Sequence, residues 1–114
     1  MGRAQPKTLL ADPALWGADP DAPLRELAPD EAGVGAWARW QNQVACAVNE
    51  KVGSSALSRA DIARGAFANE GSFGQQIVGN DFMPLDNIIG TLRFLERIDL
   101  WPTPNDWTDL GLAD

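Results

Sequence analysis

Apolar side chains recur every three or four residues in two long segments of the chain, which is the spacing of one face of an α-helix. The first segment follows Asp30, a suitable helix cap, and predicts a helix that ends at Gly53. Its apolar face carries Val34, Trp37, Trp40 or Gln41, Val44 and Val48. The second segment predicts a helix that begins at Pro84, since proline suits a first turn where its missing N–H needs no partner. Its apolar members are Leu85, Ile88, Ile89, Leu92 and Leu95.

A shorter helix is predicted to begin at Ser58. Ser58 and Asp61 have the spacing of a capping box, in which each side chain accepts a hydrogen bond from the other residue's backbone N–H. The helix is expected to end between residues 65 and 67.

A second short helix is predicted after a turn at residues 69–71, where Asn, Glu and Gly favour a change of direction. Gly71 or Ser72 would begin it, and Gly79-Asn80 would end it in a left-handed conformation. The apolar residues expected to join the two short helices are Ile62, Ala63, Phe73 and Ile77. The polar residues expected to point outward are Arg59, Ser72, Gln75 and Gln76.

The two ends of the chain differ from this central part. Residues 1–29 carry prolines at 6, 13, 20, 23 and 29, so long regular structure is not expected there. The large apolar residues in this arm predict that it docks on the core or on a partner, through one-turn helices at 13–16 and 23–27. Residues 99–114 form an acidic tail with Trp101 and Trp107. We therefore expect one domain at residues 30–98 with an arm and a tail.

The composition excludes several classes of protein. The chain has 114 residues, no histidine and one cysteine, Cys46, which rules out an intrachain disulfide, a Cys/His metal cluster and a histidine-based catalytic relay. Cys46 lies in an apolar run and is expected to be a small buried hydrophobe. Neither a membrane-spanning run nor a secretory signal is present, so we expect a cytoplasmic protein without metal or cofactor.

The net charge of −7 comes from the two ends of the chain. Residues 1–33 carry three basic and six acidic groups, residues 34–98 carry six of each, and residues 99–114 carry four acidic groups and no basic one. The central domain is therefore neutral and could still bind DNA through basic groups on one face. The acidic ends would weaken nonspecific binding to phosphates.

Residues about 34–98 resemble the lambda-repressor-like, Cro/C1-type helix-turn-helix domain. The resemblance is carried by residues 57–63 (Leu-Ser-Arg-Ala-Asp-Ile-Ala), by residues 72–79 (Ser-Phe-Gly-Gln-Gln-Ile-Val-Gly), and by Pro84-Leu85 at the start of the following helix. It implies an all-α fold of four or five helices, in which the helix that begins near Ser72 is the recognition helix.

The resemblance also implies roles for single residues. Arg59 matches a position that touches a DNA phosphate, and Asn80 matches a loop that can reach the backbone. Gly71, Ser72 and Gln75 match the region that meets base edges, and the Gln75 amide suits adenine because it can donate and accept together. Its neighbour Gln76 is a further candidate for base contact. On residue type and exposure, Arg64 is a further candidate for phosphate contact.

Two functional hypotheses follow. The first is a sequence-specific, DNA-binding transcriptional regulator of a prokaryote or phage, working as a dimer so that two recognition helices span two half-sites on double-stranded DNA. The second is a protein-interaction module, such as a phage inhibitor of a host protein or an antitoxin, that binds its partner through Trp101 and Trp107. Enzymatic activity is not expected, because the carboxylates of the arm and tail lie in sequence that would not hold a pair in place.

Overall fold

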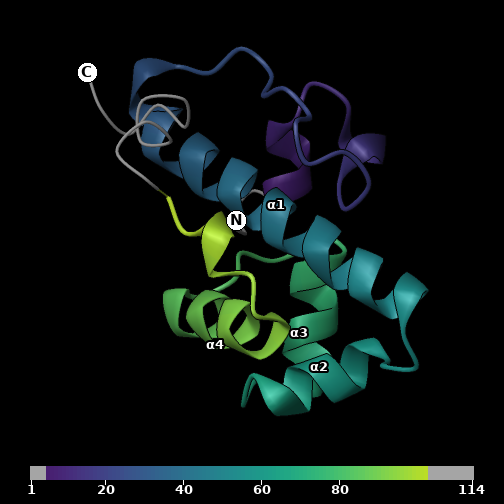
Figure 1. The fold of residues 1–114 in the computed structure, drawn as a ribbon. Helices are drawn as coiled ribbons and strands as arrows, with labels where there is room; N and C mark the ends of the chain where they lie inside the picture. The colour runs from purple at the N-terminus through teal and green to yellow at the C-terminus, as the bar shows by residue number, and fades with distance from the viewer. Residues whose placement is uncertain (1–4, 103–114) are drawn as a thin grey trace.

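The computed structural model of the protein describes residues 5–102 and is all-helical over that range. Its four α-helices are α1 (Ala32–Ser54), α2 (Arg59–Gly65), α3 (Glu70–Ile77) and α4 (Leu85–Leu95). Four short 3-10 helices accompany them: η1 (Pro6–Leu9), η2 (Pro13–Leu15), η3 (Pro29–Glu31) and η4 (Ile98–Leu100). The long helix α1 crosses the molecule, and the N-terminal segment and the three shorter helices pack along it (Figure 1). The expectation of an all-α fold is confirmed.

The apolar periodicity of α1 and α4 places both helices in one core. Val44 and Val48 of α1 are fully buried, as are Ile88 and Leu92 of α4, and all four belong to the same apolar cluster as Ile62 of α2. Burying apolar surface of this kind is the main driving force for folding. The four predicted helices thus exist with bounds close to those expected. Within residues 5–102, no helix has the length and hydropathy needed to span a lipid bilayer.

The N-terminal arm packs into the fold. Leu9 and Leu10 are each only 1% exposed, and the indole Nε1 of Trp16 donates to the carbonyl of Ile77 over 2.9 Å. The expected one-turn helix at 13–16 is present as η2, but the one expected at 23–27 is wrong. Leu24 is instead extended and pairs with Leu10 in an isolated antiparallel bridge. The Arg25 N–H donates to the Leu9 carbonyl and the Ala11 N–H to the Pro23 carbonyl, so the backbone groups of this segment find partners without forming a helix.

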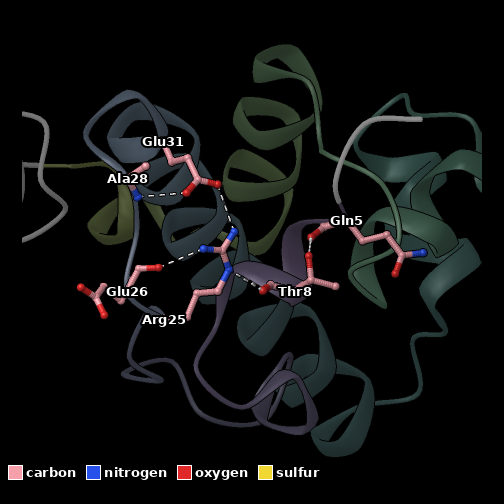
Figure 2. Close-up of polar contacts among 6 residues, drawn as sticks. All are labelled: Gln5, Thr8, Arg25, Glu26, Ala28 and Glu31. Atoms are coloured by element: carbon pink, nitrogen blue, oxygen red, sulfur yellow. Dashed lines mark hydrogen bonds and ion pairs between the residues drawn. The ribbon is translucent and has the colours of Figure 1, made fainter. Parts of the chain in front are cut away.

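One arginine ties the arm to the beginning of α1 (Figure 2). The Arg25 guanidinium donates to the carbonyls of Thr8 (3.2 Å) and Glu26 (2.9 Å), and it pairs with the Glu31 carboxylate at 3.0 Å. The second oxygen of that carboxylate accepts from the Ala28 N–H, so both interactions lower the pKa of Glu31. Glu31 is therefore ionised at neutral pH and holds the turn that leads into α1.

The loop between α3 and α4 is held by Gln41, a fully buried polar residue of α1. Its Nε2 donates to the carbonyls of Gln76 (2.9 Å) and Asp81 (3.0 Å), and its Oε1 accepts from the Met83 N–H (2.7 Å). A buried backbone group needs a partner, and here one side chain serves three of them. Gln41 therefore fixes the end of α3 and the beginning of α4 against α1.

We predict that Gln41→Leu, which keeps the side-chain volume, lowers the free energy of unfolding by about 3 kcal/mol. The reason is that three buried backbone groups lose their hydrogen-bond partner. The comparison variant is Gln43→Leu, at a half-buried position of the same helix that makes none of these bonds. It should change stability by about 0.5 kcal/mol or less. Urea denaturation followed by circular dichroism measures both, and equal losses would contradict the assigned role of Gln41.

Candidate functional site

The predicted capping box at the start of α2 is present. The Ser58 Oγ accepts from the Asp61 N–H (3.1 Å), and the Ser58 N–H donates to the Asp61 carboxylate (2.9 Å). These bonds from Ser58, with a contribution from Arg64, lower the pKa of Asp61. The charged carboxylate therefore lies in the first turn of α2, where its interaction with the helix dipole stabilises the helix.

The turn between α2 and α3 has a backbone conformation that usually calls for glycine. The Ala68 N–H donates to the Ala63 carbonyl (2.9 Å) and the Phe67 N–H to the Arg64 carbonyl (3.1 Å), which is the Schellman pattern of helix termination. Phe67 takes the left-handed position of that pattern, with φ of +59°, and its side chain is 96% exposed. For a residue with a Cβ this conformation costs roughly 1–2 kcal/mol.

The helix α3 begins at Glu70, earlier than the expected start at Gly71 or Ser72. The correction has a plain cause: the Asn69 side chain accepts from the Ser72 N–H (3.0 Å), so Asn69 is the cap rather than a turn residue. The helix keeps its predicted inner face, since Phe73 and Ile77 are 0% and 1% exposed.

The outward face of α3 differs from the prediction at one residue. Gly71, Ser72 and Gln75 are exposed, as expected. Gln76 is only 5% exposed, and its Oε1 accepts from the Asn87 Nδ2 (3.2 Å), so the expectation that it points outward is wrong. It lies next to Ile77 in the helix, and Asn87 of α4 gives its amide a partner inside the fold.

At the end of α3, three polar side chains are joined by hydrogen bonds. The Asn80 Nδ2 donates to the Gln75 Oε1 (2.8 Å), and the Lys7 Nζ donates to the Asn80 Oδ1 (2.7 Å). The Lys7 N–H also donates to the carbonyl of Gly79 (3.2 Å). Gly79 has a left-handed conformation, with φ of +85°, and follows the end of α3 as predicted. Lys7 was not among the expected site residues, because nothing in the arm's sequence shows where on the core it docks.

The two candidate arginines of α2 have different environments. Arg59 is exposed at the start of the helix, and its guanidinium donates to the Asn49 Oδ1 at 3.4 Å. Arg64 pairs with the carboxylates of Asp61 and Glu70, the latter at 2.7 Å, and these partners raise its pKa. Both arginines are positioned on the α2 side of the turn, but the charge of Arg64 is already balanced by two acids.

A different surface lies near Leu100 and Trp101. The space between the first half of α1 and the beginning of α4 is an apolar groove of about 390 Å³, with Trp37, Trp40, Leu85 and Ile88 among its lining residues. Trp40 donates from Nε1 to the Leu100 carbonyl (2.9 Å) and meets Trp101 edge to face, with ring centroids 5.3 Å apart. Trp101 is thus partly packed and 38% exposed, while Trp107 lies outside the described residues.

Cys46 does not have the environment of a reactive thiol. Its pKa is raised to about 11, first by burial and then by the nearby carboxylates of Asp19, Asp21 and Glu50. The thiol is therefore protonated at neutral pH, although it is half-buried rather than fully enclosed as expected. Among residues 5–102, no group of three or more carboxylate or cysteine side chains is placed to hold a metal ion.

Comparison of the chain with protein-family models, with curated proteins and with solved structures finds no match. What the structure establishes is an all-helical fold in which the short helices α2 and α3 are joined by a tight turn. Its resemblance to the Cro/C1 family stays a prediction.

Proposed function

We propose that the protein is a sequence-specific DNA-binding transcriptional regulator of a prokaryote or phage, in which α3 is the helix that enters the major groove. The observation that carries the proposal is the outward row of Gly71, Ser72 and Gln75 on a helix whose opposite face is buried. Gly71 and Ser72 lie in the first turn of α3, and the N-terminal residues of a recognition helix contact base edges, while the longer Gln75 side chain follows one turn later.

Gln75 is the residue best placed to read a base. Its Oε1 is occupied by Asn80, and its Nε2 has no hydrogen bond among the described residues. The bond from Asn80 orients the amide, so the Nε2 donor is directed before DNA arrives, which reduces the entropy lost on binding. Such a donor suits the N7 or O6 acceptors of a purine in the major groove. If Asn80 instead gave up its bond, the whole amide could pair with adenine.

Phosphate contacts are assigned to residues at the ends of the two short helices. Arg59 lies at the start of α2 without an ion pair to any described carboxylate, and Lys7 lies with Asn80 at the end of α3. Cations at these positions would set the register of the helix on the duplex. Lys7 supplies a positive charge that α3 itself lacks.

The proposed mechanism is occupancy of an operator. One α3 reads only a few base pairs, so a dimer that places two such helices on one face of the duplex would bind a paired site. Base contacts through Ser72 and Gln75 would give the specificity, and the phosphate contacts would give much of the affinity.

The test is selection of bound fragments from a random pool of DNA duplexes at moderate salt. We predict that the protein enriches one paired motif and that Gln75→Ala loses about 1–3 kcal/mol of discrimination at one base position, whereas Arg59→Ala weakens all sequences evenly. Gln43→Ala on α1 is the matched control and should behave like the unmodified protein. Failure to enrich any motif at low or moderate salt would overturn the proposal.

A second substitution tests the charge balance of the site. Glu70→Gln removes a carboxylate at the start of α3 and leaves Arg64 with one acidic partner instead of two. We predict tighter binding to the selected duplex, with the slope of log K against log salt steeper by about 0.9, the value for one more phosphate contact.

Glu26→Gln is the control for Glu70→Gln, because it makes the same change in net charge at an exposed position of the arm. Fluorescence anisotropy over a salt series measures both variants. Equal salt slopes for the two would show that Arg64 does not reach the DNA.

The apolar groove favours the alternative function, a protein-interaction module. Trp101 belongs to this surface through its edge-to-face contact with Trp40, which lines the groove. An apolar surface of this kind holds a partner without needing ion pairs. In that case a partner retained by the protein from a bacterial lysate should stay bound at high salt and be lost from Trp101→Ala. Loss of the partner with rising salt, as for a phosphate ligand, would contradict this alternative.

A further inference from the structure

A second candidate site lies on the turn between α2 and α3, and it is formed by residues other than the outward row of α3. Phe67 is almost entirely exposed there, in the left-handed conformation where glycine is the usual residue. Exposure of a large apolar ring is unfavourable in water, and its backbone conformation adds strain. Neither is offset by any described contact, so the residue is unlike the other aromatic side chains of the fold.

A hollow of about 280 Å³ lies beside Phe67, and its lining includes two glycines, Gly65 and Gly90. A Cβ on Gly65 would lie 2.3 Å from the ring of Phe94, and a Cβ on Gly90 would lie 2.6 Å from the carbonyl oxygen of Ala66. The absence of both Cβ atoms lets α4 approach the end of α2 and lays the Phe94 ring over it. Phe67 and Phe94, which is 39% exposed, are the two aromatic walls of the hollow.

The charged group at the hollow is Arg93. It is exposed on α4 and forms no ion pair with any residue that the structure describes, whereas Arg25, Arg64 and Arg97 all do. The lining of the hollow contains this cation and no carboxylate. The hollow therefore suits a ligand in which a negative group lies next to an apolar one.

From these features we infer that the hollow formed by Phe67, Arg93 and Phe94 is a docking site for a peptide segment of a partner protein. The segment carries a large apolar side chain, which enters between the two rings, next to a carboxylate, which pairs with Arg93. A nucleic-acid ligand is disfavoured because binding along a phosphate backbone uses several cations, and the lining of the hollow supplies one, Arg93. The inference does not depend on DNA binding by α3.

The test uses a displayed library of short random peptides, selected on the full-length protein. The expected result is a motif that pairs Asp or Glu with Trp, Phe or Leu. Phe67→Gly should weaken the enriched peptide by about tenfold or more, as for an aromatic anchor. The same variant should be as stable as the unmodified protein or more so, because glycine adopts a φ of +59° without strain, and unfolding therefore cannot explain the loss.

Arg93→Glu should change the enriched motif from acidic to basic residues beside the apolar side chain, which a nonspecific apolar surface would not do. Ile98→Ser, at an exposed apolar position outside the hollow, is the control and should leave binding unchanged. The inference is overturned if no motif is enriched, if Phe67→Gly binds the peptide normally, or if random single-stranded oligonucleotides bind in a manner that depends on Phe67.

Discussion

The arrangement of this fold depends on the hydrogen bonds that α1 makes to the loop between α3 and α4. The Gln41 amide, buried in α1, serves one backbone group at the end of α3 and two of that loop, and the Trp37 indole donates to a fourth, the Met83 carbonyl, over 3.0 Å. Apolar packing holds α3 against the core but would tolerate small rotations, whereas these directional bonds do not. They therefore determine which residues of α3 face outward, and any function of that face depends on them.

The helices of this fold are predictable from sequence where a periodic apolar pattern and a capping residue agree. The apolar spacing of α1 and α4 and the Ser58–Asp61 pair predicted their helices well, because these signals are local. The prediction is wrong where contacts between elements decide whether a side chain is buried. Gln76 is polar and was expected outside, but Asn87 gives it a buried partner from a different helix. The position of Lys7 beside Asn80 was equally invisible, since docking of an irregular arm leaves no periodic pattern.

The net charge does not show which surfaces of this molecule could bind a charged ligand, because several cations are neutralised by neighbouring carboxylates. Arg64 is held by Asp61 and Glu70, and Arg25 by Glu31, so these cations contribute little to the field at a distance. Arg59 and Arg93 form no ion pair with a described residue, and they lie at two different surfaces. The surfaces for which we propose ligands are distinguished by cations without an ion pair to a described residue, Lys7 and Arg59 at one and Arg93 at the other, rather than by the overall balance of acids and bases.

The arm and the end of α3 share contacts that connect their energetics. Lys7 and Trp16 both lie against Gly79, where an added Cβ would come within 2.8 Å of Lys7 and 3.0 Å of Trp16, and Lys7 reaches Gln75 through Asn80. The docked arm and the Gln75 amide are thus joined by a continuous run of hydrogen bonds. By thermodynamic linkage, the free energy by which a docked arm favours this orientation of the Gln75 amide equals the free energy by which the orientation favours docking of the arm. Because the N-terminal segment is covalently attached, its effective concentration at the end of α3 does not depend on how dilute the protein is.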